Sequence, residues 1–538
     1  MTSTAHAIGA TDSPLLEETI GSAFDRTVAM HPDHEALVVP FQGVRLTYRQ
    51  LADNVDRLAR GLLALGLDTG DRVGMWSPNN AEWVYLQFAA AKAGVILVNI
   101  NPAYQTEELR FALSQSGCRA LVSATGFKSS DYAAMVSGVR STLPNLEHVV
   151  FLGTAEWDGL LAEGDRGLPE ALAARSASLT NRDPINIQYT SGTTGFPKGA
   201  TLSHRNLLNN GYFLGKGFRY TEADRVCIPV PFYHCFGMVI GNLACLTHAT
   251  TTVLPAPSFD ALSTLQTVEA EHCTSLLGVP TMFIAMLGHP DFHSFDLSSL
   301  RTGMMAGSPC PIEVMKQCVD EMHMSEVTIG YGMTETSPVS TQTSPDDPLE
   351  KRVGSVGRVL PHVEVKVIDP DTGSIVGRNA PGEFCTKGYS VMLGYWNESQ
   401  MTAEAIDADG WMHSGDLATM DDEGYVSIVG RIKDMIIRGG ENIYPREVEE
   451  FLYTHPDIVD VQVVGVPDEK YGEELVAWVR LREGASLTRD ELAEFCKGRI
   501  AHFKIPRHVH ITDEFPMTVT GKIQKYKMRE QSIEYLGL

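Results

Sequence analysis

Residues 189–199 read YTSGTTGFPKG, a run of hydroxyls, glycines and one lysine whose types suit the binding of polyphosphate. Glycines let backbone N–H groups approach oxygen anions, the hydroxyls add neutral donors, and Lys198 adds a point charge that matches phosphate. The apolar stretch 185–189 predicts a strand and Ser203 can cap a helix, so we expect a loop between regular elements. The spacing is not that of the G-x-x-x-x-G-K-[ST] nucleotide loop, because Pro197 precedes the lysine and a glycine follows it.

A flexible surface loop is the plainer interpretation, and an isolated G-T-T-G would favour it. Four more motifs follow along the chain: YGMTET at 331–336, SGD at 414–416, GRIKDMIIRGGENIYP at 430–445 and GKIQK at 521–525. In residue types and order, the five motifs resemble the adenylate-forming superfamily of acyl-CoA synthetases, aryl-CoA ligases, luciferases and peptide-synthetase adenylation domains. The resemblance extends over almost the whole chain.

The resemblance implies that ATP, and later AMP, binds at these motifs. Asp416 would accept hydrogen bonds from the ribose hydroxyls, Arg431 would donate to the nucleotide, and Tyr331 would offer a flat face to adenine. Without the motifs, the two charges would more often form a surface ion pair, and the aromatic ring would more often be packing. The nucleotide-binding residues implied in this way are Thr190, Ser191, Gly192, Thr193, Thr194, Gly195, Phe196, Pro197, Lys198, Gly307, Ser308, Pro309, Tyr331, Gly332, Met333, Thr334, Asp416 and Arg431.

The activation of a carboxylate explains why such residues are needed. A carboxylate is a poor electrophile that the phosphates of ATP repel, so charge must be neutralised while the attacking oxygen is held in line with the α-phosphate. The resemblance makes Lys522 the catalytic lysine that bridges carboxylate and phosphate, Glu335 the Mg²⁺-binding carboxylate, and Thr190 a hydroxyl near the metal and the α-phosphate. One glutamate suffices, because Mg²⁺ takes its other ligands from phosphates and water. Without the motif, Lys522 would be an exposed charge in a lysine-rich tail.

A second step, in which a thiol attacks the acyl-adenylate, requires positioning and the exclusion of water. The glycines of the 430–445 motif permit close backbone approach, and the resemblance assigns Gly439, Gly440 and Glu441 to the binding of coenzyme A. It also implies that a small cap domain rotates between the steps about a hinge at Lys433, although the neighbouring Asp434 is a competitor for that role.

Residues 231–241, PFYHCFGMVIG, resemble the wall of the family's acyl pocket. The segment contains no carboxylate to pair with an amino-acid ammonium, which disfavours an amino-acid substrate. His234 would gate or orient the substrate, although a lone histidine among aromatics is often a satisfied core residue. Met238, Val239 and Met333 would form an adaptable apolar lining for an alkyl chain. The wording of the 435–445 segment and of HFKIP at 502–506 most resembles medium-chain acyl-CoA synthetases.

Composition is consistent with a cytoplasmic enzyme. Lys and Arg number 43 against 67 acidic residues, and the net charge of −24 argues against a nucleic-acid-binding surface. The nine cysteines are scattered without a C-x-x-C pair, which predicts reduced thiols that mostly fill the core. The most apolar internal run, 236–246, is far shorter than the roughly 20 residues that span a bilayer. We therefore expect no nucleic-acid partner and no transmembrane segment.

Helical patterns alternate with short β-rich runs along the larger part of the chain. Thr47 can cap a helix that Gly66 closes, residues 72–76 predict a strand, and residues 81–93 predict another helix. Such alternation predicts a layered α/β architecture. Residues 161–183, in which charged residues, Gly, Pro and Ser are interspersed, are expected to form a surface connection.

The pattern changes after Arg431. Residues 459–466 and 475–481 predict two strands and 488–499 predict a helix, which fits a compact α+β unit of about a hundred residues. The resemblance implies the same division: a large multi-layer N-terminal adenylate-forming domain at 1–430, a hinge at 431–434, and a small, mobile α+β C-terminal domain at 435–538.

The sequence thus predicts an AMP-forming ligase that joins a carboxylic acid, expected to be a medium-chain fatty acid, to coenzyme A with ATP and Mg²⁺. A stand-alone adenylation enzyme that loads a carrier protein is an alternative, and a catalytically silent nucleotide-binding homologue is another. The protein is expected to act as a monomer or homodimer.

Overall fold

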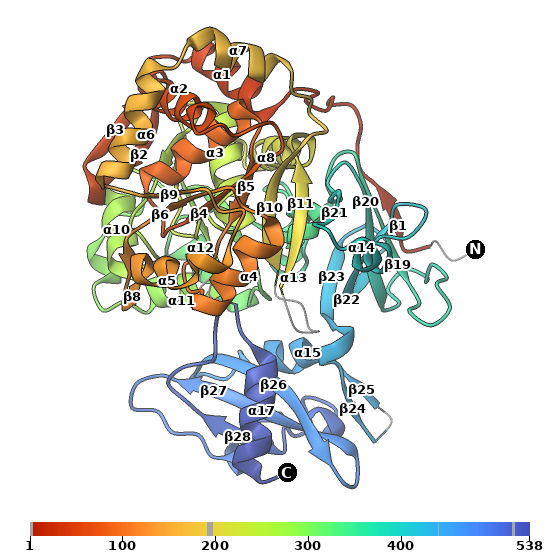
Figure 1. Ribbon diagram of the computed structural model, residues 1–538. Coiled ribbons are helices and arrows are strands. Elements are labelled where there is room, and N and C mark those ends of the chain that lie inside the picture. Colours follow the sequence, from red (N-terminus) through yellow and green to blue (C-terminus); the bar gives the residue numbers. More distant parts are fainter. Residues whose placement is uncertain (1–3, 191–196, 440, 519–521) are drawn as a thin grey trace.

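The computed structural model describes residues 4–190, 197–439, 441–518 and 522–538, which form a large unit and a smaller unit beneath it (Figure 1). Two mainly parallel sheets make up the centre of the large unit. In the described part of the chain, the first runs in the order β21 (Gly394–Tyr395), β11 (Lys198–Ser203), β10 (Pro184–Thr190), β5 (Ile96–Asn99), β4 (Arg72–Trp76), β6 (Ala120–Ser123), β9 (His148–Phe151). The second runs in the order β18 (Arg358–Val359), β17 (Val339–Gln342), β16 (Glu326–Gly332), β15 (Thr302–Ala306), β14 (Ser275–Gly278), β12 (Arg225–Cys227), β13 (Thr251–Val253), β2 (Glu35–Val39), β3 (Val44–Thr47).

Helices join the two sheets into one hydrophobic core, to which α1, α2, α3, α8 and the π-helical η3 all contribute buried residues. The helices of the large unit are α1 (Ile20–Met30), α2 (Tyr48–Ala64), α3 (Ala81–Ala93), α4 (Thr106–Ser116), α5 (Tyr132–Val139), α6 (Ala155–Arg166), α7 (Pro169–Ala177), α8 (His204–Gly217), η3 (Phe236–Leu243), α9 (Ala244–His248), α10 (Ala261–Ala270), α11 (Pro280–Leu287), α12 (Ile312–Asp320), α13 (Leu349–Gly354) and α14 (Ser399–Ala405). The short strands β7 (Gly126–Phe127) and β8 (Ser130–Asp131) pair beside α5.

Local sequence signals account for several of these elements. Thr47 caps α2 in a capping box with Gln50, and Gly66 follows the helix at φ +76°. The apolar stripe of α2 is buried, at Leu51, Val55, Leu58 and Leu62. Strand β4 and helix α3 have the predicted bounds, and Ser203 caps α8.

The segment 161–183 lies largely on the surface, as expected, but it is helical. The segment contains the end of α6 and the whole of α7, which pack against α2. Helix α7 starts with Pro169 at its first turn, where the missing N–H costs nothing, and continues through alanines of high helix propensity. The interspersed polar residues were the exposed side of these helices.

A third sheet and the small unit complete the fold. The third sheet runs in the order β1 (His6–Ile8), β19 (Val363–Ile368), β20 (Gly382–Gly388), β22 (Met412–Met420), β23 (Val426–Arg431). The small unit has the sheet β25 (Glu441–Ile443), β24 (Ile436–Arg438), β27 (Gly472–Leu481), β26 (Ile458–Asp468), with β28 (His508–Ile511) beside β27, and helices α15 (Pro445–Leu452), α16 (Arg489–Cys496) and α17 (Lys525–Leu536). The predicted fold, a large layered α/β domain with a small α+β domain, is confirmed.

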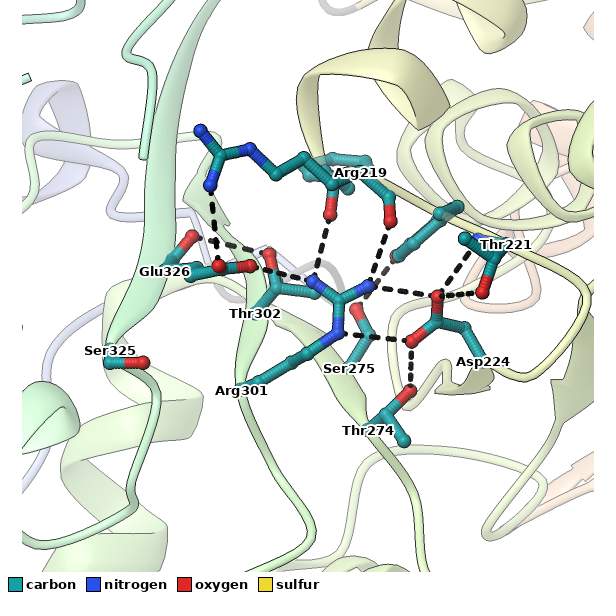
Figure 2. Close-up of polar contacts among 12 residues, drawn as sticks. Arg219, Thr221, Asp224, Thr274, Ser275, Arg301, Thr302, Ser325 and Glu326 are labelled. Atoms are coloured by element: carbon teal, nitrogen blue, oxygen red, sulfur yellow. Dashed lines mark hydrogen bonds and ion pairs between the residues drawn. The ribbon is translucent and has the colours of Figure 1, made fainter. Parts of the chain in front are cut away.

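The amino ends of three parallel strands in the second sheet, β12, β15 and β16, are tied together by Arg301, which directly precedes β15 (Figure 2). Its guanidinium donates to both oxygens of Asp224 at 3.2 and 2.8 Å and to Glu326 at 2.6 Å. The remaining donors bond to the carbonyls of Phe218 and Arg219. Parallel strands share direction, so fixing this edge leaves the opposite edge, where the carboxyl ends lie, free to carry a ligand site.

Candidate functional site

Glu335 connects the two central sheets at that opposite edge. It lies in η5 (Thr334–Thr336), the 3-10 turn after β16, and is 5 % exposed. Thr190 at the end of β10 donates to its Oε1 at 3.1 Å, and the Tyr395 hydroxyl of β21 donates to the same oxygen at 2.9 Å. Lys198, the register partner of Thr190 in the β10–β11 hairpin, holds Nζ 5.1 Å from the centre of the Tyr395 ring. Both ends of the 189–199 motif therefore adjoin one buried carboxylate.

A chain of polar contacts joins the second and third sheets. The hydroxyl of Tyr331, in β16, donates to Asp416 Oδ2 at 2.6 Å, and Arg431 Nε donates to Asp416 Oδ1 at 3.1 Å. Asp416 and Arg431 are register partners on β22 and β23. Burial raises the pKa of Asp416 above its ordinary value, although the Arg431 charge and the Tyr331 hydroxyl oppose this shift. The Tyr331 ring also packs against Phe384, with the two ring planes at 86°.

Lys522 of the small unit reaches into the large unit. A Cβ placed on Gly307, the residue after β15, would lie 3.7 Å from Lys522 Cε, and Gly307 has φ +91°. Desolvation lowers the pKa of Lys522 from its ordinary value, and Arg431 acts in the same direction, while Cys235, Glu335 and Asp416 oppose it. Lys522 of the small unit therefore lies close to the predicted site residues Glu335 and Asp416 of the large unit.

His234 faces the same group of charges. Burial lowers its pKa to about 3, and the Lys522 charge contributes to the shift. The backbone N–H of Phe236 donates to His234 Nδ1 at 3.1 Å, so the neutral ring carries its proton on Nε2. The histidine is neutral at physiological pH and offers a donor rather than a charge.

Two other predicted acyl-pocket residues, Met238 and Val239, lie on η3, a stretch of π-helix, a geometry often found at functional sites, and Met333 lies between β16 and η5. Met238 is 1 % exposed, and its sulfur accepts from the side-chain amides of Asn99 and Gln188 at 3.1 and 3.2 Å. Val239 is fully buried, whereas Met333 is half-buried. Met238 therefore has a fixed position, and Met333 is the more adaptable of the two methionines.

The residues assigned to coenzyme A and to the hinge lie elsewhere on the small unit. Gly439 has φ +62° and donates to the Tyr471 carbonyl at 2.7 Å, and Glu441 is exposed on β25. In Figure 1 the β24–β25 hairpin lies below α15 and extends away from the large unit. Lys433 lies in the 3-10 turn Ile432–Asp434, directly after β23. The arrangement brings Lys522, and not the hairpin, against the large unit.

Other predicted residues follow the ends of strands. Pro197 directly precedes β11, Ser308 and Pro309 follow β15, Gly332 ends β16, and Thr334 is buried at the start of η5. Seven predicted residues lie outside the described part of the chain: Ser191, Gly192, Thr193, Thr194, Gly195, Phe196 and Gly440.

Sequence reasoning missed Tyr395, which holds Glu335, and the amides of Asn99 and Gln188, which hold Met238. No local signal marks them, because each contact joins distant parts of the chain. A buried amide that follows an apolar strand, as Asn99 does, is the nearest to a usable signal.

Family models match two parts of the chain. Residues 24–396 match the model described as AMP-binding enzyme, and residues 447–522 match the model for the AMP-binding enzyme C-terminal domain. In the described residues, no helix combines the length and apolarity needed to cross a membrane.

Relatives aligned over nearly the whole chain agree with these family models. The putative acyl-CoA synthetase YngI of Bacillus subtilis (strain 168) is 48% identical, over 97% of this chain and 99% of that protein. The mitochondrial medium-chain acyl-CoA ligase ACSF2 of Danio rerio is 47% identical, over 99% of this chain and 92% of that protein.

Among solved structures, the anthranilate CoA ligase AuaEII in complex with anthranoyl-AMP has a TM-score of 0.87 at 26% identity, over 99% of this chain and 100% of that chain. ATP-bound MatB from Rhodopseudomonas palustris has a TM-score of 0.82 at 29% identity, over 96% and 99% of the two chains. With a family model matched from residue 24 to residue 396 and relatives nearly half identical over their whole lengths, the chain belongs to the AMP-binding enzyme family.

Proposed function

We propose that the protein joins a medium-chain fatty acid to coenzyme A, with ATP as the energy source and an acyl-adenylate as the intermediate. The enzyme class, an AMP-forming acid–thiol ligase that binds ATP, follows from the family and the relatives. One observation carries the mechanism: Lys522 of the small unit approaches Gly307 of the large unit and shares an electrostatic environment with Glu335 and Asp416.

In the proposed first step, the acid's carboxylate attacks the α-phosphorus of ATP and pyrophosphate leaves. Lys522 holds its ammonium between the carboxylate and the phosphate and offsets their repulsion, while Lys198 neutralises the outer phosphates. Glu335 binds Mg²⁺: among the described residues, Thr190 and Tyr395 both donate to Oε1, which leaves Oε2 to the cation. Asp416 accepts the ribose hydroxyls, and Arg431 keeps it oriented.

In the proposed second step, the thiol of coenzyme A attacks the acyl carbonyl and AMP leaves. The small unit turns at Lys433, withdraws Lys522 and brings the Gly439–Gly440–Glu441 segment to the site. The exposed position of Glu441 supports this order, because the β24–β25 hairpin does not contact the site while Lys522 lies against the large unit. His234 donates from Nε2 to an oxygen of the substrate without adding charge beside Lys522.

The acid is assigned from the wall and from the relatives. The 231–241 segment has no carboxylate, and the Danio rerio relative is named as a medium-chain ligase. The half-buried Met333 provides an adaptable contact for an alkyl chain.

The proposal also includes a reducing, cytoplasmic location and action as a monomer or homodimer. All nine cysteines are buried free thiols, which suits a reducing compartment.

Pyrophosphate release tests the proposal. The purified protein is incubated with ATP, Mg²⁺ and acids from acetate to long-chain and aryl acids, with and without coenzyme A. We expect release to be greatest with medium-chain acids and thioester to form only when coenzyme A is present. A maximum at aryl or short acids would overturn the substrate class. Adenylation with no thioester would favour the loading of a carrier protein, and ATP binding without pyrophosphate release would favour a silent homologue.

A further inference from the structure

Three side chains of the third sheet bring together a carboxylate, a thiol and an imidazole. Glu383 and Cys385 are two residues apart on β20 and so share a face, and His413 on β22 is the register partner of Cys385. His413 Nδ1 lies 3.0 Å from Glu383 Oε2 and 3.6 Å from Cys385 Sγ. One ligand atom from each residue lies within 4.8 Å of the other two.

These separations fit a small tetrahedral metal site. A zinc ion binds nitrogen and oxygen at about 2.0 Å and sulfur at about 2.3 Å, so adjacent ligands of a tetrahedron lie about 3.3 to 3.6 Å apart. The two distances from His413 Nδ1 fall close to this range. Small side-chain movements would place all three ligands around one ion.

The surroundings of the histidine favour the same use. Asp407 Oδ2 lies 3.7 Å from His413 Nε2, on the side of the ring opposite the other two groups. The nearer carboxylate, Glu383, accepts from Nδ1 in the structure. An ion at Nδ1 would displace that proton, and Asp407 would then face Nε2–H, an arrangement common around metal-bound histidines. Glu383 is oriented as well, because its Oε1 accepts the Gly415 N–H at 3.0 Å.

We propose that Glu383, Cys385 and His413 bind one zinc ion, with water as the fourth ligand and Asp407 orienting His413. The side chains of His413 and Glu383 are 30% and 13% exposed, so an ion can enter from their side and reach the buried Cys385. Mg²⁺ prefers oxygen ligands, so this site does not compete with Glu335 for it. The negative charges of Glu383 and Asp407 offset the positive charges of the ion and of Lys366. The Lys366 ammonium lies 4.2 Å from the centre of the Trp411 ring.

The competing interpretations make different predictions. A plain ion pair between His413 and Glu383 would need no thiol and would bind no metal. A redox-active cysteine would need an exposed thiolate, whereas Cys385 is fully buried. Binding of zinc to the sulfur releases the thiol proton to solvent, so the affinity for zinc should increase with pH.

Cobalt provides a direct test that needs no catalytic activity. The full-length protein is stripped with a chelator and titrated with Co²⁺, a spectroscopic substitute for zinc, in millimolar Mg²⁺. We expect one equivalent to bind, with a thiolate-to-cobalt charge-transfer band and the visible bands of a four-coordinate ion, and we expect Zn²⁺ to remove both. Absence of these bands in the folded wild-type protein would overturn the proposal.

Variants identify the ligands. Cys385→Ser should abolish the charge-transfer band, and His413→Gln should weaken binding at least tenfold. Asp407→Asn should weaken it about 10- to 100-fold, as loss of a carboxylate behind a metal-bound histidine typically does. Cys496→Ser, which removes a buried thiol of the small unit, is the matched control and should leave the spectrum unchanged. If Cys385→Ser does not fold, His413→Gln decides, and unchanged cobalt affinity in that variant would refute the site.

Discussion

The most informative single residue is Lys522, because its position and its pKa have the same cause. The side chain is partly buried against the large unit, and desolvation lowers its pKa. An ammonium in such surroundings interacts strongly with an anion, since little water screens the contact. The lysine is therefore suited to the charge that accumulates when a carboxylate attacks a phosphate.

Replacement of this lysine should separate the two steps. Lys522→Ala is expected to reduce adenylation about 100-fold or more, the size of effect seen when one preorganised donor is removed from a transition state. Conversion of a supplied acyl-adenylate to thioester should be largely retained. Pyrophosphate release and thioester formation, measured separately, check this. Lys527→Ala, an exposed lysine nearby, is the control and should be close to wild type. Equal loss in both steps of a folded variant would remove Lys522 from its assigned role.

The direction of the pKa shift predicts a pH dependence. Because the pKa of Lys522 is lowered, the ammonium is lost at a lower pH than in an ordinary lysine, whose pKa is 10.5. The rate of adenylation should therefore decline on the alkaline side below that value. In Lys522→Arg, the guanidinium stays protonated, so any remaining activity should lack this decline. The pH–rate profiles of the two proteins provide the measurement, and identical alkaline limbs would contradict the assignment.

At the scale of elements, the sequence predicted what depends on neighbours along the chain. Thr47 as a cap and Gly66 at the end predicted α2, and the bounds of β4 and α3 were correct because each is a clear local pattern. The helices within 161–183 were not predicted, because two helices with wide polar faces resemble a loop when their packing partner α2 is unknown. Tyr395 was not foreseeable, because its contact with Glu335 joins β21 to the end of β16.

The contacts of Arg301 at the amino ends of the strands in the second sheet can be tested for their contribution to stability. Arg301→Leu would leave Asp224, whose side chain is 5% exposed, without its charged partner, and should destabilise the large unit by about 3 kcal/mol. The urea midpoint of unfolding measures this. Arg49→Leu breaks a pair whose side chains are 60% and 82% exposed, and should change stability by less than about 0.5 kcal/mol. Similar midpoints for the two variants would show that the Arg301 contacts do not stabilise the fold.

At the scale of the whole molecule, the two units meet in a specific orientation. Arg446 at the start of α15 donates to the Ile428 carbonyl of β23 at 3.0 Å, and Lys522 contacts the Gly307 loop from another part of the small unit. Both contacts belong to the arrangement that we propose for adenylation. The thioester step should depend on them less, since the small unit must leave this position.

Arg446→Ala tests that asymmetry. Loss of a hydrogen bond from a charged donor costs about 1.5 kcal/mol, which corresponds to roughly a tenfold reduction in adenylation. The conversion of supplied acyl-adenylate should be reduced much less. Arg482→Ala is the matched control, because Arg482 donates to Pro456 within the small unit at 2.8 Å. If both arginine variants lose the two half-reactions alike, the Ile428 contact does not select the orientation.

The pairing of Arg431 with Asp416 has a consequence for how the intermediate survives. Arg431 is the last residue of β23 and the first residue of the proposed hinge 431–434, so the axis of rotation starts beside the proposed ribose pocket. Displacement in a rotation grows with distance from its axis. The parts of the small unit that lie far from the hinge would therefore be displaced most, and the atoms next to Asp416 least. The acyl-adenylate, a reactive mixed anhydride, would thus stay bound while the small unit rotates, and little of it would be hydrolysed between the half-reactions.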